Sequence, residues 1–260
     1  MSITGKSPSE TYKDIAYVDN SNTGVTTSLK QVKTGNGSST ALQVSDRSLQ
    51  VKSATNNTTA LDVQNASGTS KLLVDTTNNY VKANNEHVNT QYAHFGIGSG
   101  DSVFAGASAN NHYAIPFNGY GNQALASIGT GTDPDTSLTI ATTADDVTCC
   151  LWFVMDNITI DRVVWWSGAD AASGDTTRCH LMSYSIDSDN GSTSGDLSSG
   201  TVLADGADIT NAGFQQAYYQ QMTIQSSDVS AGKVVLFTFR SDSVNSDFAI
   251  NATIKYHITG

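Results

Sequence analysis

The sequence is poor in proline, cysteine and charge, and each shortage limits the choice of fold. It contains 3 prolines and 3 cysteines among 260 residues, and only 14% of its residues are charged. Because the number of cysteines is odd, a framework of paired disulfides is not expected. Gly, Ser, Thr and Asn are abundant instead. That composition is typical of short strands joined by tight turns and argues against a helix bundle.

Long apolar runs are also missing. No stretch of about 18 apolar residues occurs, the length that a membrane-spanning helix needs, and so we expect no membrane insertion. The first residues, MSITGKSPSETYKD, lack the apolar segment of a secretory signal, and from them we expect none.

Basic residues are scarce in the larger part of the chain. Residues 84–260 hold 5 Lys or Arg against 18 Asp or Glu, a balance of −13, whereas residues 1–83 hold 8 against 6, a balance of +2. The change near residue 84 predicts a domain boundary. The negative balance of residues 84–260 should repel nucleic acid, so we expect no nucleic-acid partner.

A short repeat occupies residues 34–85. Four units of the form Leu-x-Val occur there, each followed by a polar turn sequence rich in Ser, Asn, Thr or Gly. Alternate residues of a strand share a face, so each unit presents two apolar side chains to one side. The eight side chains are Leu42, Val44, Leu49, Val51, Leu61, Val63, Leu72 and Val74.

These apolar side chains are too few to stabilise the repeat as a folded monomer. The burial of about eight of them does not offset the conformational entropy lost when roughly 50 residues become ordered. Three copies wound about a common axis would bury the apolar faces against each other and pair the strand edges between chains. We therefore predict that residues 34–85 form the shaft of a homotrimer with these side chains as its core. The alternative is a flexible linker in which the Leu-x-Val units occur by chance.

The C-terminal region predicts a compact all-β domain. Residues 126–260 contain eight candidate strands separated by loops rich in Gly, Ser and Asp, and strict apolar alternation runs from Phe248 to Ile258. Eight strands in this length are typical of a jelly-roll-like β-sandwich. The expected organisation is an N-terminal anchor segment (1–33), the β shaft (34–85), a collar rich in Gly and aromatic residues (86–125) and the sandwich (126–260).

Several of these segments resemble a known class of protein. ITGKSPSETYKD and VDNSNTGVTTSLKQVKTGNGSSTALQVS look like the N-terminal parts of fibre-type structural proteins of tailed bacteriophages, marine phages especially, and TALDVQNASGTSKLLVD is similar to the shaft repeats of phage tail fibres. DTSLTIATTADDVTCCLWFVMDNITIDRVVWW resembles, less specifically, the C-terminal domains of such virion proteins. The resemblance covers residues 1–90 well. It departs from the family in the short shaft and in the lack of an intramolecular chaperone tail.

The resemblance implies a homotrimeric virion appendage that is assembled in the host cytoplasm. Residues 1–33 would attach to another virion protein, and the distal sandwich would bind host-surface polysaccharide. Two alternatives stay open: a capsid decoration or head-fibre protein without a receptor role, and a fibre-borne glycan depolymerase. A depolymerase needs a long grooved scaffold and an evident pair of acidic residues, so we expect no enzymatic activity and no cofactor.

Four aromatic residues are candidates for glycan binding. Trp165, Trp166, Tyr218 and Tyr219 lie in predicted strands, where neighbours face opposite sides. One tryptophan is therefore expected in the core, and the other is expected to be exposed as a stacking platform. Roles in the core or at a trimer interface are the alternative. Three shallow sites on one trimer would suit glycan binding, because avidity compensates for weak single-site affinity.

Patterns for metal binding are weak. DSDNG at 187–191 resembles the start of a calcium loop, with Asp187 and Asp189 as its ligands, but Ser198 stands where the twelve-residue loop needs an acid. A zinc site built from the three cysteines and one histidine is disfavoured, because adjacent residues of a strand point to opposite faces. Its ligands would be Cys149, Cys150, Cys179 and His180.

Catalytic patterns are equally weak. Acidic residues in predicted loops are the candidates for a hydrolytic pair, but Asp is a common turn residue and no pair stands out. These residues are Asp145, Asp146, Asp170 and Asp175. The G-x-S-x-G and H-E-x-x-H motifs do not occur.

Overall fold

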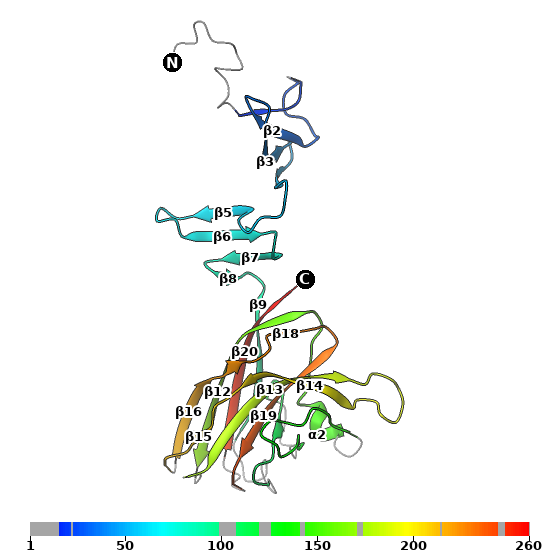
Figure 1. Cartoon of the computed structure of the whole chain (residues 1–260), viewed down its shortest axis with the longest axis vertical. Coiled ribbons are helices and arrows are strands. Elements are labelled where there is room, and N and C mark those ends of the chain that lie inside the picture. Colours follow the sequence, from blue (N-terminus) through cyan, green and yellow to red (C-terminus); the bar gives the residue numbers. More distant parts are fainter. Residues whose placement is uncertain are drawn as a thin grey trace. The chain divides into compact units, whose positions relative to one another are not determined.

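The computed structural model describes residues 16–21, 23–98, 108–119, 126–140, 144–170, 174–213, 215–243 and 248–259. These residues form two compact units, Met1–Val88 and Asn89–Gly260. Nearly all regular structure is antiparallel β-sheet (Figure 1), as predicted from the composition. No helix among the described residues is long and apolar enough to cross a membrane.

The first sheet of the N-terminal unit has four strands in chain order. They are β1 (Ala16–Val18), β2 (Lys30–Thr34), β3 (Ser39–Val44) and β4 (Leu49–Val51). Strands β3 and β4 form a hairpin in which Leu42 lies opposite Val51 and Val44 lies opposite Leu49. The first two Leu-x-Val units are therefore paired directly with each other, and their side chains share one face of the sheet.

The second sheet repeats this arrangement. Its strands, again in chain order, are β5 (Leu61–Gln64), β6 (Ser70–Asp75), β7 (Tyr80–Ala83) and β8 (Glu86–His87). Leu61 lies opposite Val74, and Val63 lies opposite Leu72. Strand β7 extends the same apolar face with Val81 and Ala83. One side of this sheet is therefore almost entirely apolar.

Polar turns close these hairpins, as the Asn- and Thr-rich sequences predict. Asp75 ends β6, and one of its carboxylate oxygens accepts hydrogen bonds of 2.9 Å from the backbone N–H groups of both Thr77 and Asn78. Asn79 then adopts a φ of 59°, in the left-handed region that Asn tolerates better than most residues. Local turn chemistry of this kind sets the register of β6 against β7.

The C-terminal unit is a sandwich of two sheets. The β9 sheet has the strand order β16-β12-β20-β9, with β18 paired to β12. Its strands are β9 (Thr90–Ile97), β12 (Ile158–Asp170), β16 (Gln215–Gln221), β18 (Asp228–Val229) and β20 (Phe248–Ile258).

The β13 sheet is the other half of the sandwich. It has the order β10-β19-β13-β14-β17, with β11 paired to β19 and β15 paired to β13. Its strands are β10 (Tyr113–Ile115), β11 (Trp152–Phe153), β13 (Thr176–Ile186), β14 (Leu197–Asp205), β15 (Ile209–Thr210), β17 (Thr223–Ile224) and β19 (Lys233–Ser241).

The connectivity is that of a jelly roll. The eight principal strands are, in chain order, β9, β10, β12, β13, β14, β16, β19 and β20. Numbered 1 to 8, they are arranged 6-3-8-1 in one sheet and 2-7-4-5 in the other. Successive strands alternate between the sheets, except that β13 and β14 are neighbours in one sheet, and this is the arrangement of a jelly roll. The jelly-roll-like sandwich predicted from the sequence is confirmed.

The main core lies between the two sheets. Alternate residues of β20, among them Phe248, Ile250 and Ile254, pack against side chains of the opposite sheet such as Leu181 and Phe237. A second cluster covers the outer face of the β13 sheet with the short helix α2 (Ala144–Thr148) and the segment 126–140. That outer face is therefore buried, whereas the outer face of the β9 sheet is not covered by a second layer of the described residues.

The structure differs from the sequence-based boundaries in two respects. The sandwich begins at β9, within the expected collar, because β9 pairs with β20 along its whole length and buries Phe95 in the core. The apolar run TCCLWFVM (148–155) was predicted from the sequence as one of the eight strands, and this prediction is wrong in its first half. Helix α2 ends at Thr148, and only β11 is extended, because the apolar run buries Cys150 through a helical turn rather than by alternation.

The larger gaps in the description fall in the expected anchor segment and collar. Residues 1–15 of the anchor segment, and residues 99–107 and 120–125 of the collar, lie outside the described residues.

Candidate functional site

The outer face of the β9 sheet brings aromatic, polar and small residues together. Strand alternation separates the two tryptophans of β12, as predicted: Trp165 points into the core and is 0% exposed, whereas Trp166 is 50% exposed. Trp165 donates a hydrogen bond from Nε1 to Gln220 Oε1 at 3.2 Å. The prediction that Trp165 binds glycan is therefore corrected, because a buried indole offers no face to a ligand.

Trp166 forms an aromatic pair with Tyr219. The two residues lie opposite each other in the register of β12 and β16, and their ring centroids are 4.9 Å apart with an interplanar angle of 54°. Tyr219 is 47% exposed. The pair presents a fixed apolar surface to solvent, which is the arrangement that sugar rings stack on.

Tyr218, the fourth aromatic candidate, lies on the other side of its strand. It is half-buried and faces the same side as the buried Ser167. Its hydroxyl accepts a hydrogen bond of 2.7 Å from the backbone N–H of Ala212. Tyr218 therefore holds the loop before β16 and is not part of the exposed aromatic pair.

A shallow groove of about 450 Å³ lies beside Trp166. Its lining comes from three neighbouring strands and from a loop after β10, so residues far apart in the sequence meet there. Besides Trp166 they are Gly96, Ile97, Gly98, Gly119, Gly168, Ala249, Ile250 and Asn251.

Small residues create this groove. Gly96 and Asn251 are paired in register, and Gly168 and Ala249 are paired in the adjacent row, so the floor beside the indole has almost no side chains. A Cβ atom at Gly168 would meet only the Cβ of Ala249, at 3.8 Å. A residue larger than glycine therefore fits at position 168. The open space beside Trp166 results from the small side chains around it and not from a backbone conformation that only glycine adopts.

Arg162 lies beside Tyr219 in the aromatic pair. Its Nη2 donates a hydrogen bond of 3.1 Å to the Tyr219 hydroxyl. Arg162 follows a β-bulge in β12, which switches the alternation and brings Arg162, Val164 and Trp166 to the outer face. None of the ion pairs among the described residues includes Arg162.

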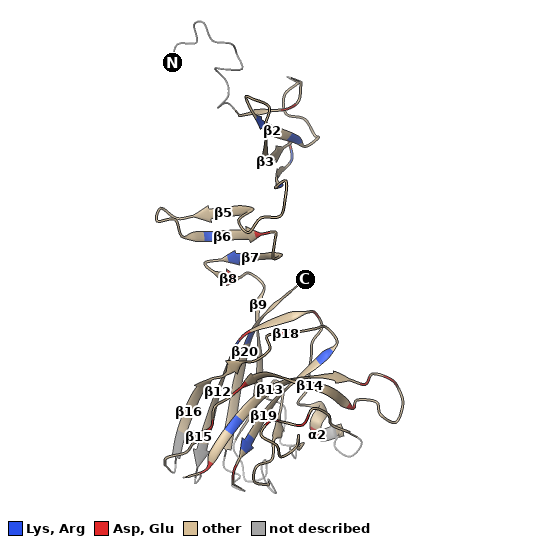
Figure 2. Ribbon diagram, in the orientation of Figure 1, with Lys and Arg blue, Asp and Glu red and all other residues tan. Residues whose placement is uncertain are grey.

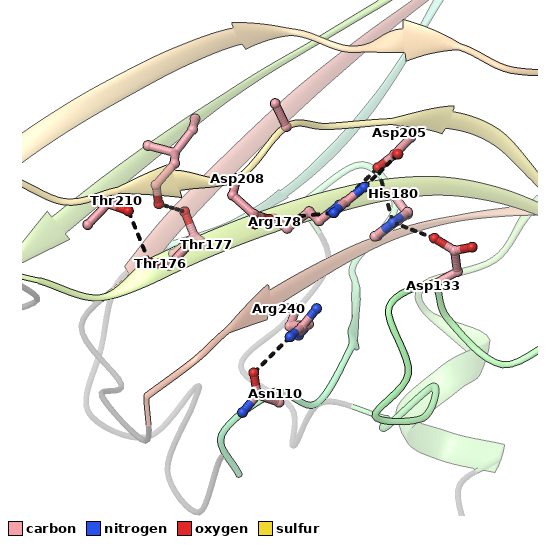
Figure 3. A network of polar contacts seen from close by, with 12 residues as sticks. Asn110, Asp133, Thr176, Thr177, Arg178, His180, Asp205, Asp208, Thr210 and Arg240 are labelled. Atoms are coloured by element: carbon pink, nitrogen blue, oxygen red, sulfur yellow. Dashed lines mark hydrogen bonds and ion pairs between the residues drawn. The ribbon is translucent and has the colours of Figure 1, made fainter.

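A polar network on the β13 sheet is the second candidate site (Figure 3). Arg178 binds both carboxylate oxygens of Asp205, at 3.0 and 2.6 Å. His180 Nε2 lies 3.2 Å from Asp205 Oδ1 and 3.3 Å from Asp133 Oδ1. The ring of His180 also contacts that of His112 edge to face, with centroids 5.0 Å apart.

Burial rather than catalysis explains this network. His180 and His112 are both fully buried. Burial and the neighbouring His112 lower the pKa of His180 to about 4, despite the opposing effect of Asp205. A substrate cannot reach an imidazole that is buried in this way, and so the network is structural.

The metal-site candidates are not assembled. One Asp187 oxygen accepts a bond from the Asp189 N–H at 3.0 Å, and the other accepts one from the Thr193 hydroxyl at 2.6 Å. These two bonds lower the pKa of Asp187 and show that its carboxylate closes its own turn. Within the described parts of the chain, no group of three or more His, Cys, Asp or Glu side chains is placed to hold a metal ion.

The candidate zinc and hydrolytic residues are likewise dispersed. The three cysteines are free thiols, and burial raises the pKa of both Cys150 and Cys179. Asp146 lies on α2, whereas Asp175 precedes β13 and accepts a hydrogen bond from Ser243. Asp145 and Asp170 lie in α2 and at the end of β12.

Most of the predicted trimer-core side chains are exposed within a single chain. Six of the eight are more than a third exposed, with Leu49 the highest at 67%. These six are Leu42, Leu49, Val51, Leu61, Val63 and Leu72. The hairpins form within one chain, but their apolar faces have no cover among the described residues of the same chain.

Comparisons with known proteins give little information on the family. The sequence matches no family model, and no curated protein matches it. Among solved structures, one match is the N-terminal endo-1,4-β-D-xylanase 10B of Clostridium thermocellum, CBM22-1–GH10 modules complexed with xylohexaose. It has 15% identity and a TM-score of 0.21, and the match covers 42% of this chain and 18% of the xylanase chain. A TM-score this low does not support a common fold.

The groove and Arg162 were not predicted from the sequence. Residues 86–125 were expected to form a collar rich in Gly and aromatic residues, yet Gly96 belongs to β9 and to the groove floor. The informative signal is the glycine inside an otherwise apolar or aromatic strand pattern, which often marks close approach of a ligand or another backbone. Gly168, three residues after Trp165, carries the same signal.

Proposed function

We propose that the protein is a fibre-type or spike-type structural protein of a bacteriophage virion, which binds host-surface glycan with its C-terminal sandwich. In this role it is a binding protein and not an enzyme. The proposal combines the resemblance of residues 1–90 to phage fibre proteins with the exposed surface of the β9 sheet.

The observation that carries the glycan-binding part is the Trp166–Tyr219 pair beside the open groove. The two rings contact each other while each stays about half exposed, so they form a contiguous apolar patch, and exposed apolar patches often mark binding sites. The groove next to the indole is open and carries Asn251, whose amide can both donate and accept hydrogen bonds. Stacking on an aromatic ring together with a few polar contacts is how a shallow protein surface binds a sugar chain.

The trimeric part is supported by the apolar faces of the two small sheets. Each sheet keeps two edge strands and one face of Leu and Val side chains that no described residue of the chain covers. A single chain would leave these faces in water, whereas association of three chains would bury them and cover the edges. A trimer would also place three weak glycan sites on one particle.

The glycan proposal is tested by direct binding. The full chain is applied to an array of bacterial surface polysaccharides together with two variants, Trp166→Ala and Gly168→Val. The first removes the stacking surface, and the second fills the groove with a side chain that strands favour. Both should reduce binding at least about tenfold, a loss of roughly 1.4 kcal/mol, with little change in thermal stability.

The matched control is Phe153→Ala, an exposed aromatic residue on the β13 sheet, at 48% exposure. It should leave glycan binding unchanged. If the wild-type chain binds no glycan, or if all three variants bind like wild type, the outer face of the β9 sheet is not a glycan site.

A further inference from the structure

We infer that the outer face of the β9 sheet binds an uncharged polysaccharide chain, which lies across the strands from the Trp166–Tyr219 pair to the loop beside β9. This inference rests on the proposed function and deepens it. It gives the charge class of the glycan and the direction of the chain on the sheet.

The shape of the groove is the first step. Its lining covers positions 166–168 on β12, 249–251 on β20 and 96–98 on β9, three neighbouring strands of one sheet. Three residues of a strand extend about 7 Å from first to last, whereas neighbouring strands are about 4.8 Å apart. The groove is therefore longer across the strands than along them.

The loop after β10 lengthens the groove in the same direction. It bonds to the backbone of β9: the Gly96 N–H donates to Pro116 O at 2.9 Å, and the Asn118 N–H donates to His94 O at 2.8 Å. Gly119 of this loop also lines the groove. From Trp166 to this loop the groove crosses three inter-strand spacings, about 14 Å in all. A single sugar ring does not fill that length, so the ligand is a chain of sugar units.

The outward-facing residues around the groove are uncharged. They form three rows across the strands, and within the described parts of these strands none of them is Asp, Glu, Lys or Arg. In one row His94 Nδ1 and Thr253 Oγ1 are hydrogen-bonded at 3.2 Å. In the order β16, β12, β20 and β9, the rows are Gln221, Val164, Thr253 and His94; Tyr219, Trp166, Asn251 and Gly96; and Ala217, Gly168 and Ala249.

Uncharged polar groups suit a sugar chain whose polar groups are hydroxyls. Asn251 is exposed and lies between Trp166 and Gly96 in the middle row. Its amide both donates and accepts hydrogen bonds, as a sugar hydroxyl does. A carboxylate or sulfate in the same place would lose water without meeting a cation, which costs more free energy than the desolvation of a hydroxyl.

The charged residues on this face flank the three rows and do not favour an anion. Arg162 and Lys255 lie opposite each other in the next row, but Asp161 and Asp228 lie on the same face. At the other end of β12, Asp170 follows in the row after Gly168. The flanking charges are therefore mixed, and acidic residues are in the majority.

The charge of the whole unit acts in the same sense. Basic residues are few in the sandwich (Figure 2), and residues 84–260 hold 5 Lys or Arg against 18 Asp or Glu. A negative balance of this size repels a polyanion before it reaches the surface. An uncharged chain is not repelled.

The charge class is tested on the array of bacterial surface polysaccharides. Each member that contains uronic acid is printed in its native form and after reduction of its carboxyl groups to alcohols. The full chain should bind uncharged members, and Trp166→Ala should abolish this binding. A reduced form should bind at least about fivefold more tightly than its native form at low salt, and the difference should shrink at about 1 M salt, which screens the repulsion.

The direction is tested by variants at a distance from Trp166. A Cβ atom at Gly98 would meet no atom within 4 Å, so Gly98→Val fits the backbone and narrows the groove at β9. It should weaken binding at least about tenfold. Asn251→Ala removes the central amide and should weaken binding at least about threefold, as expected for the loss of one hydrogen bond.

Tyr92→Ser is the matched control. Tyr92 is 59% exposed on the outer face of β9, but it lies about 20 Å from Gly98 along the strand. The variant should bind glycan like the wild type. Thermal melts establish that all variants are folded.

The outcomes separate this inference from the proposed function. Trp166-dependent binding in which native anionic forms bind as tightly as reduced forms, or more tightly, would overturn the uncharged class and leave glycan binding intact. A Gly98→Val variant that binds like the wild type would overturn the direction across the strands. No Trp166-dependent binding to any member of the array would overturn both proposals.

Discussion

At the scale of single residues, His180 shows how burial determines the protonation of a side chain. His180 is enclosed by the β13 sheet and by the segment 126–140, next to a second buried histidine and within 3.3 Å of two carboxylates. Neither of its ring nitrogens has a partner in hydrogen-bond geometry among the described residues. Burial without a hydrogen bond to either nitrogen disfavours the charged ring, which agrees with the lowered pKa of His180.

The lowered pKa of His180 makes stability depend on pH. Its pKa is about 4 in the folded chain, against 6.5 for an unperturbed histidine, so the unfolded chain binds a proton more readily. The resulting stability is present above pH 6.5 and decreases as the pH falls from 6.5 towards 4. For this one group the loss is on the order of 3 kcal/mol. We expect a lower melting temperature at pH 4.5 than at pH 7.

The variant His180→Phe isolates this contribution. It keeps an aromatic ring against His112 but cannot titrate, so its melting temperature should change less between pH 7 and pH 4.5 than that of the wild type. His94→Gln, at an exposed position on β9, should behave like the wild type. Equal pH dependence in all three proteins would contradict the assignment to His180.

At the scale of elements, the hairpins of the N-terminal unit are the part of the structure that follows most directly from the sequence pattern. The Leu-x-Val spacing predicted that two side chains of each unit share a face, and the register confirms it by pairing the units two by two. The pattern could not show which units pair, because register depends on turn geometry as well as on apolar spacing.

The exposed faces of these hairpins predict an effect on assembly. Leu49→Thr together with Val63→Thr should leave an isolated chain about as stable as before, since surface substitutions usually change stability by about 0.5 kcal/mol or less. In a trimer held by these faces, the same change should lower the mass in solution. Light scattering at several concentrations measures this.

Gln50→Ser together with Asp62→Asn is the matched control. These residues lie on the same two strands but face the opposite side. The control should keep the mass of the wild type. If the two double variants have the same mass, the Leu-x-Val face is not the contact between chains.

Other elements were less predictable, for identifiable reasons. The strand β20 follows from strict alternation between Phe248 and Ile258. The run TCCLWFVM is apolar without a clear period, and a short apolar run does not separate helix from strand. The groove was unpredictable in a different way, because Gly96, Gly168 and Asn251 come from three strands that only the sheet order brings together.

At the scale of the whole molecule, the division after residue 88 determines which fragments of the chain we expect to fold. The sandwich includes β9, which contributes Phe95 to the core and pairs with β20 along one edge. We expect a fragment of residues 89–260 to fold and a fragment of residues 126–260 to fail, because the latter loses both β9 and β10. Circular dichroism and thermal melts distinguish the two outcomes.

The masses of the same proteins test the division of roles between the units. The whole chain should have three times its mass of 27.3 kDa in solution, and the fragment 89–260 should be monomeric. A monomeric whole chain would refute the trimeric shaft. A trimeric fragment would move the contact between chains to the sandwich.

The pairing of β9 with β20 has a practical consequence for handling the protein. Thr90 lies opposite His257, so the chain enters and leaves the sandwich at the same end, whereas Gly98 is about 27 Å further along the strand, beside the groove. A dye, an affinity tag or a surface tether attached after Thr259 therefore leaves the groove unobstructed. The same geometry makes the sandwich suitable for circular permutation, with a short linker joining its ends and new termini opened in an exposed loop.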